Sequence, residues 1–141
     1  MRIAFDENTP RAVARALRIL AAADAVDSEQ PLEVLHVLDF LEQGTPDVPL
    51  IQAVADGSHR KAALITTDKA MRTRQHERAA FVDTGCIGIV LRGNWNHASL
   101  WDRARLSLMW WRVWTAQVQV APPGSLWQSP WSQKPKPLRP Y

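Results

Sequence analysis

Short apolar runs that stop abruptly at polar residues recur along the first two thirds of the chain. Arg2 to Phe5 (RIAF) ends at Asp6, and Leu32 to Leu38 (LEVLHVL) is apolar and rich in branched side chains. Ala62 to Thr66 (AALIT) and Cys86 to Leu91 (CIGIVL) have the same character. Runs of this length between turn residues predict buried strands. We therefore expect four strands at these positions.

The segments between these strands carry apolar residues at helical spacing. Thr9 and Pro10 predict a helix start, as N-cap and first helical residue. The expected helices run from Thr9 to Ala23, from Asp47 to Gly57, over a short stretch after Arg78, and from Ala98 to Thr115. Asp24 to Pro31 is expected as a polar turn, and Gln117 to Val120 is compatible with an edge strand. Strands that alternate with helices predict an α/β fold, here a three-layer α/β/α sandwich with a mainly parallel central sheet.

The chain changes character after residue 120. Six of the ten prolines lie from Pro122 onward, which predicts an extended and weakly structured segment. We therefore expect a domain at residues 1–120 and a basic Pro/Trp-rich tail at residues 121–141. Residues 101–141 contain six Lys/Arg and one acid, against 11 Lys/Arg and 13 acids before them. Such a basic terminal part favours a polyanion such as nucleic acid, with a solubilising tail as the alternative.

Three aspartates fall where predicted strands end or a helix begins. Asp6 follows the first strand directly, Asp68 lies two residues after the third, and Asp47 opens the helix after the second. Because the carboxyl ends of parallel strands share one edge of a sheet, we expect the three to converge. Crowded carboxylates repel one another, and Mg²⁺ or Mn²⁺ relieves the repulsion. The sequence therefore predicts a catalytic metal centre that activates water against a phosphodiester, with Glu7 and Asn8 as outer contacts.

Helix capping is the alternative interpretation of each aspartate taken alone. Asp side chains often accept hydrogen bonds from backbone N–H groups at helix starts and turns. Capping competes most strongly at Asp47, which precedes a helix, and Asp68 could be an ordinary turn residue. Asp6 is the hardest to explain in this way, since Glu7 follows it at the end of a buried strand. The three together indicate a metal centre more than any one of them does.

Two motifs in this sequence resemble a known family. Arg2 to Pro10 (RIAFDENTP) looks like the opening of PIN-like proteins, in which a strand delivers the first acidic ligand, and Leu64 to Lys69 (LITTDK) resembles their later Thr-x-Asp-Lys motif. The basic stretch Arg72 to Ala80 (RTRQHERAA) and the aromatic helix after Leu91 are similar to the branch grouped with VapC-type toxins. The resemblance covers residues 1 to about 120.

The resemblance implies a Mg²⁺- or Mn²⁺-dependent endoribonuclease, often the toxin of a type II toxin–antitoxin pair. RNA and an antitoxin protein would then be its partners. The acidic ligands carry over to Asp6, Asp47 and Asp68. Many PIN domains have a fourth acid after the third, for which Asp83 is the candidate by order in the chain, with Asn94 or Asn96 as a weaker substitute.

Basic residues directly follow Asp68 and are expected to line the same crevice. Phosphate contacts from such cations would offset the repulsion between RNA and the carboxylates. A solvated helix face is the alternative for any run of charges. The predicted RNA-binding residues are Lys69, Arg72, Arg74 and Arg78.

All seven tryptophans lie in the last third of the chain. Trp110, Trp111 and Trp114 span too wide an arc to be buried against one sheet face. We expect some to be covered by a partner chain, a second copy in a homodimer or the chain's own tail. Burial in a core or interface is favoured over base stacking.

The remaining features narrow the class of function. No apolar run approaches the ~20 residues needed to span a bilayer, and the early Asp6 argues against a secretory signal, so we expect no membrane association and a cytoplasmic location. The single Cys86 fits a reducing compartment and is expected to be inert. Two alternatives to a nuclease are a non-catalytic interaction module and a receiver-like Mg²⁺-binding signalling domain. The latter needs a lysine after the fifth strand, and no lysine occurs between Lys69 and Lys134.

Overall fold

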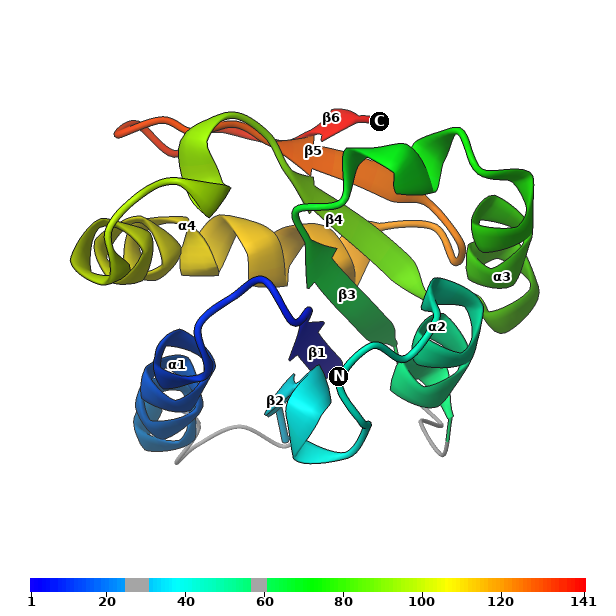
Figure 1. Ribbon diagram of the computed structural model, residues 1–141. Helices are drawn as coiled ribbons and strands as arrows, with labels where there is room; N and C mark the ends of the chain where they lie inside the picture. The colour runs from blue at the N-terminus through cyan, green and yellow to red at the C-terminus, as the bar shows by residue number, and fades with distance from the viewer. Residues whose placement is uncertain (25–30, 57–60) are drawn as a thin grey trace.

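The computed structural model describes residues 1–24, 31–56 and 61–141 and contains one six-stranded sheet (Figure 1). The strands are β1 (Arg2–Phe5), β2 (Glu33–His36), β3 (Ala62–Thr66), β4 (Ile87–Leu91), β5 (Leu126–Ser129) and β6 (Arg139–Pro140). Their order across the sheet is β2-β1-β3-β4-β5-β6, with β1 to β5 parallel and β6 antiparallel to β5. The expected mainly parallel central sheet is therefore confirmed.

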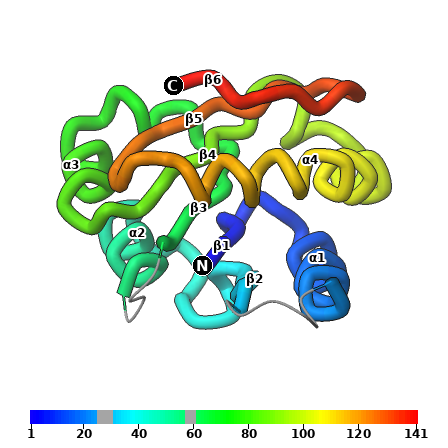
Figure 2. The backbone as a smooth tube through the Cα atoms, turned by 180° about the vertical axis from the view of Figure 1, so that it is seen from behind, coloured from blue at the N-terminus to red at the C-terminus, as the bar shows by residue number. Residues whose placement is uncertain are grey.

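Helices cover both faces of the sheet and complete a three-layer sandwich. The helices are α1 (Arg11–Asp24), α2 (Asp47–Ala55), α3 (Gln75–Thr84) and α4 (Leu100–Val120). Buried side chains of α1 and α4 pack in one apolar cluster, and those of α2 and α3 pack in the other. Figure 2 shows α4 crossing the strands on the face opposite α2 and α3. Because β3 and β4 lie between the two clusters, every residue of both strands is buried.

The strand order places a natural crevice at the ends of β1 and β3. The chain moves from β1 to β2 in one direction and then crosses back over β1 to β3. In open parallel sheets this reversal leaves a crevice beyond the carboxyl ends of the two strands, where ligands bind. Asp6 follows β1 and Asp68 follows β3, so both belong to this edge.

The C-terminal segment forms part of the sheet, which corrects the expectation of a weakly structured tail. Residues Leu126–Ser129 pair with β4 as a parallel fifth strand, and Leu138 is buried in the core. The contact with β4 is so close that a Cβ at Gly88 would lie 2.4 Å from Leu126 Cδ2. The sheet therefore does not end at residue 120, and Pro140 itself belongs to the paired strand β6.

Several predicted boundaries also shift. Gln117 to Val120 is the last turn of α4, not an edge strand. The second strand is only Glu33–His36, because Val37–Asp39 turns into a 3₁₀ helix. The helix expected from Thr9 begins at Arg11. Most of the expected turn at Asp24 to Pro31, and Gly57 at the expected end of the second helix, lie outside the described residues.

The chain's own C-terminal segment covers two of the tryptophans of α4, Trp110 and Trp114. Trp110 and Trp114 are fully buried. The Trp110 Nε1–H donates to the carbonyl of Ser132 at 2.8 Å, and the Trp114 Nε1–H donates to Ser129 Oγ at 2.9 Å. Burial by the chain's own tail is one of the three possibilities expected from the sequence for these tryptophans. Trp101, by contrast, is 81% exposed.

None of the described helices is both long and apolar enough to cross a membrane.

Candidate metal centre

Asp6 ties the ends of β1 and β3 together. Its Oδ1 accepts hydrogen bonds from the backbone N–H and the hydroxyl of Thr9, at 3.2 and 3.3 Å. Its Oδ2 accepts from the Thr66 hydroxyl at 2.6 Å and from the Thr67 N–H at 3.0 Å. Burial raises the pKa of Asp6, and these hydrogen bonds oppose the rise. The carboxylate is therefore a structural acceptor as well as one wall of the crevice.

Two neighbours extend this network to the surrounding turns. The Thr66 hydroxyl, which donates to Asp6, accepts the N–H of Asp68 at 3.0 Å and so fixes the turn after β3. Buried His36 holds the other side, with Nε2 2.7 Å from the carbonyl of Thr9. Its Nδ1 accepts the N–H of Leu38, so Nε2 must carry the proton that Thr9 accepts. Asp6 therefore positions Asp68 both through the Thr66 hydroxyl and through the backbone N–H of Thr67.

Asp47, Asp68 and Glu77 form a carboxylate cluster, with one oxygen from each lying within 4.8 Å of the others. Asp47 is in the first turn of α2, and Pro46, not Asp47, is the N-cap residue. Asp68 caps the 3₁₀ helix Lys69–Arg72, because its Oδ1 accepts the N–H of Ala70 at 2.9 Å. Glu77 comes from the first turn of α3 and is 7% exposed. Three separate elements therefore aim negative charge at one point.

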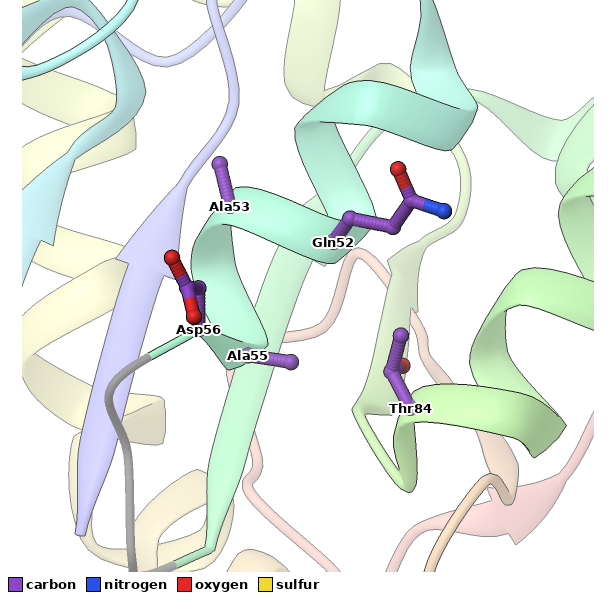
Figure 3. Close-up of a pocket in the computed structure, with 5 residues that line it drawn as sticks. All are labelled: Gln52, Ala53, Ala55, Asp56 and Thr84. Atoms are coloured by element: carbon purple, nitrogen blue, oxygen red, sulfur yellow. The ribbon is translucent and has the colours of Figure 1, made fainter.

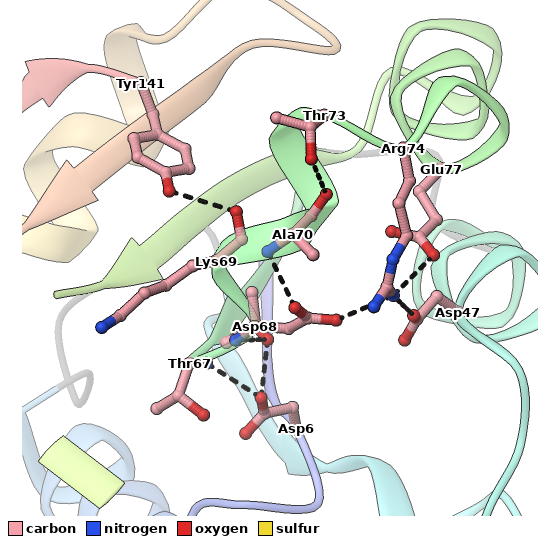
Figure 4. Close-up of polar contacts among 11 residues, drawn as sticks. Asp6, Asp47, Thr67, Asp68, Lys69, Ala70, Thr73, Arg74, Glu77 and Tyr141 are labelled. Atoms are coloured by element: carbon pink, nitrogen blue, oxygen red, sulfur yellow. Dashed lines mark hydrogen bonds and ion pairs between the residues drawn. The ribbon is translucent and has the colours of Figure 1, made fainter.

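The Arg74 guanidinium lies at that point (Figure 4). Its Nη1 is 3.1 Å from Asp47 Oδ2, 3.2 Å from Asp68 Oδ2 and 3.0 Å from Glu77 Oε1. The hydrogen bond to Glu77, followed by the charge of Asp68, raises the pKa of Arg74. One side-chain nitrogen thus occupies the position of a cation shared by three acids. About half of the side chain is exposed, so it can leave without unpacking the core.

One positive charge does not satisfy three carboxylates. Burial, followed by the neighbouring Glu77 and Asp68, raises the pKa of Asp47 to about 6, although Arg74 opposes the rise. The second oxygen of Glu77, Oε2, is buried and has no hydrogen-bond partner in the described part of the chain. Burying a carboxylate oxygen without a hydrogen-bond partner lowers the stability of the fold, so the binding of another cation or a proton at this oxygen is favourable.

Asp6, Asp47 and Asp68 line one pocket of about 190 Å³. Its remaining walls are Glu7, Asn8, Gly44, Thr45, Leu50, Thr66 and Met71. The structure therefore brings the three predicted aspartates to one crevice. Asp6 nevertheless stands apart from the carboxylate cluster, because its two oxygens are taken up by Thr9, Thr66 and Thr67.

The other acids predicted to assist the metal centre, Glu7 and Asp83, lie in different places. Glu7 Oε1 accepts the N–H of Gly44 at 2.8 Å, which holds one wall of the pocket. Asp83 is exposed near the end of α3 and does not line the pocket. Glu77, from the start of the same helix, is the acid that joins Asp47 and Asp68. In the sequence Glu77 lies among basic residues, and the only hint was that Ala80 and Phe81, at i+3 and i+4, place it on the buried face of the helix.

The predicted RNA-binding cations also occupy different environments. Arg74 lies among the carboxylates, and the Arg72 guanidinium lies 5.2 Å from the centre of the Tyr141 ring. Lys69 and Arg78 are exposed. Lys69, Arg72 and Arg78 are therefore exposed to solvent, whereas Arg74 belongs to the carboxylate cluster itself.

A family model described as PIN-like domain matches residues 1–93, which is about two thirds of the chain and includes all the acids of the pocket. The chain belongs to the PIN-like domain family. PIN-like domains are commonly metal-dependent nucleases that bind divalent ions. No curated protein and no solved structure matches this chain.

The residues present fit the divalent ion that this family implies. Mg²⁺ and Mn²⁺ prefer oxygen ligands, and this PIN-like domain offers three carboxylates from three elements. The unpartnered Oε2 of Glu77 supplies an acceptor that no described protein group uses. The residues that would hold the ion are Asp47, Asp68 and Glu77, with Asp6 fixing the turn that carries Asp68.

A larger hollow of about 500 Å³ lies at the opposite edge of the sheet, between the C-terminal ends of α2 and α3 (Figure 3). Its lining residues are Gln52, Ala53, Ala55, Asp56 and Thr84. Their polar groups do not point toward a common centre in Figure 3. A ligand site needs a few convergent polar groups, so we assign no function to this hollow.

Proposed function

We propose that this PIN-like domain is a Mg²⁺- or Mn²⁺-dependent endoribonuclease that uses Asp47, Asp68 and Glu77 to hold the ion. The observation that carries this proposal is the carboxylate cluster with its unpartnered buried oxygen, located at the crevice of the sheet. When bound, the ion would lower the pKa of a water molecule and stabilise charge on the phosphodiester. The water oxygen bonds to phosphorus while one P–O ester bond breaks, which yields a phosphate monoester and a hydroxyl.

The chain's own residues supply the positioning. Hydrogen bonds of Asp6 and Thr66 position the turn of Asp68, so that its Oδ2 lies beside Asp47 and Glu77 in the carboxylate cluster. Exposed positive charge for the phosphates of the substrate comes from Lys69, Arg72 and Arg78. Without such cations the carboxylates would repel RNA.

A cleavage assay tests the proposal directly. Pure protein is mixed with end-labelled single-stranded RNA and Mn²⁺. We expect cleavage that EDTA stops and that Asp68→Asn and Glu77→Gln abolish. Asp83→Asn is the matched control, because it removes one exposed acid of α3 outside the pocket. Cleavage that survives in the Glu77→Gln protein would remove Glu77 from the metal centre, and the absence of any metal-dependent cleavage would contradict the proposal.

We further propose a cellular role as the toxin of a type II pair, of the VapC-like kind, with an antitoxin protein as its partner. The basic stretch Arg72 to Ala80 and the aromatic helix after Leu91, which resemble the VapC-type branch, support this role. Cells that express the wild-type chain alone should stop growing, and cells that express Glu77→Gln should grow normally. Normal growth with an enzyme that is active in vitro would contradict the role.

A receiver-like signalling domain is the alternative from another class. It needs a lysine after the fifth strand that reaches the acids, and Lys134 and Lys136 do follow β5. Neither lines the acidic pocket, and the cation among the acids is Arg74. Incubation with acetyl phosphate distinguishes the two, since a receiver would become phosphorylated on Asp68 and a nuclease would not.

A further inference from the structure

A second, basic pocket lies beside the sheet at β5 and β6. It has a volume of about 160 Å³ and is lined by Arg92, Gln128, Pro130, Lys136, Pro137 and Arg139. Among the described residues, three cations and one amide line this space and no acid does. Its volume equals about five water molecules at ~30 Å³ each, which is enough for a phosphate group and part of its solvent.

The charges of this basic pocket are not neutralised by neighbouring acids. None of Arg92, Lys136 and Arg139 forms an ion pair within the part of the chain that the structure describes. Arg92 donates one N–H to the Tyr141 hydroxyl at 2.7 Å, and a guanidinium has five. Three positive charges around one small space repel one another, so the binding of an anion between them is favoured.

The backbone that carries the basic pocket is held in place by strand pairing and by core packing. Gln128 of β5 is paired with Arg139 of β6, and the Gln128 amide donates to the carbonyl of Pro140 at 3.1 Å. Leu138, between the lysine and the arginine of the pocket, is buried in the core. The cations therefore extend from a fixed frame, which lowers the ordering cost of binding.

Tyr141 joins this pocket to the metal centre. Its hydroxyl accepts from Arg92 and donates to the carbonyl of Lys69 at 3.1 Å (Figure 4). The guanidinium carbons of Arg72 and Arg92 lie 5.2 and 5.1 Å from the centre of its ring. Lys69 follows Asp68 directly in the sequence. A row of cations therefore extends from the carboxylate cluster across the edge of the sheet to Arg139. Side chains two positions apart on a strand point to the same face of the sheet, so Gln128 lies on the same face as Leu126, which packs with α2 and α3. The row of cations therefore stays on that face of the sheet.

We propose that the basic pocket binds a backbone phosphate of the single-stranded nucleic acid that the domain cuts, a few nucleotides from the metal centre. This inference rests on the proposed nuclease function for the identity of the ligand. The row of cations favours a polymer over a free anion, since a strand presents phosphates at regular intervals along it. The C-terminal segment would then add a phosphate contact to those proposed for Lys69, Arg72 and Arg78.

Binding of a fluorescent single-stranded RNA in EDTA tests the pocket without any cleavage. The full-length protein is titrated by anisotropy over a range of salt concentrations. We expect Lys136→Ala/Arg139→Ala to weaken binding at least about fivefold and to reduce the slope of log affinity against log salt by about 0.7, the value for one lost phosphate contact on a single strand. Lys136→Arg/Arg139→Lys should restore most of the binding.

Arg15→Ala/Arg112→Ala is the matched control, because it removes two exposed positive charges from α1 and α4. It should change the affinity less than twofold. An equal loss in this control, or unchanged binding in the pocket variant, would overturn the pocket. The pocket is also overturned if inorganic phosphate binds the wild type and not the pocket variant while RNA binds both equally, since the site would then take small anions only. RNA binding through the pocket without any cleavage would leave the pocket standing and contradict the nuclease.

Discussion

Replacing Asp47 with asparagine should stabilise the metal-free protein at neutral pH, although it removes one partner of Arg74. Burial, then Glu77 and then Asp68 raise the pKa of Asp47 from 3.8 to about 6. A rise of about two units corresponds to about 3 kcal/mol at ~1.36 kcal/mol per unit. Because 29% of the side chain is exposed, solvent screens much of this energy, and we expect about 1 kcal/mol.

The sign of the pH dependence follows from the direction of the shift. An acid with a higher pKa in the folded state binds its proton more tightly there than in the unfolded state. The free energy of unfolding of the wild type should therefore fall as the pH rises from about 4 to about 6, and stay lower above that window. Asp47→Asn should lack this part of the fall, so the advantage of the variant grows from about pH 4 to about pH 6 and is complete above that window.

Thermal unfolding in EDTA at pH 4.5 and 7.5 measures the difference. At pH 7.5 the Tm of Asp47→Asn should exceed that of the wild type by about 3 °C, and at pH 4.5 the two should be nearly equal. Asp83→Asn is the control and should follow the wild type at both values. Saturating Mn²⁺ should reverse the order, since only the wild type gains the stabilisation of a bound ligand. A variant that is less stable than the wild type at pH 7.5 would refute the electrostatic reasoning.

Three further changes test other parts of the structure. Asp6→Asn should lower the unfolding free energy by about 1–3 kcal/mol, because the amide leaves the buried N–H of Thr67 or Thr9 without its acceptor; an unchanged denaturant midpoint would contradict this role. Arg74→Gln should tighten Mn²⁺ binding in calorimetry by about tenfold, because the competing cation is gone; weaker binding would show that Arg74 supports the ion rather than competes with it. A chain cut after residue 120 should fail to fold, judged by the loss of its cooperative thermal transition. The cut removes β5, one of the two neighbours of β4, and Ser129, the hydrogen-bond acceptor of Trp114. A cooperative transition like that of the full chain would contradict this.

The strands of the crevice could be predicted from the sequence for a physical reason. Arg2–Phe5 and Ala62–Thr66 are buried on both sides, so they appear as continuous apolar runs that end sharply at a polar turn. Parallel pairing then required Asp6 and Asp68 to lie at one edge of the sheet. For the same reason the general position of the metal centre was predictable.

The remaining parts depend on contacts between residues that are distant in sequence. The C-terminal strand Leu126–Ser129 has only four residues, and its partner β4 lies more than thirty positions earlier, so nothing local marks it as a strand. Glu77 and Arg74 look like part of a charge run in the sequence, because only the packing of α3 against α2 turns them toward Asp47. Which of Asp6 and Glu77 completes the carboxylate cluster was decided by the hydroxyls of Thr9 and Thr66, whose hydrogen bonds no periodicity encodes.

The most direct measurement is a crystal soaked in Mn²⁺ and examined by anomalous scattering. An anomalous peak should appear among the carboxylates of Asp47, Asp68 and Glu77, with oxygens at about 2.1–2.2 Å and the Arg74 side chain displaced from the position it holds here. A crystal that binds no manganese there, or binds it away from these three side chains, would contradict the metal centre and the nuclease built on it.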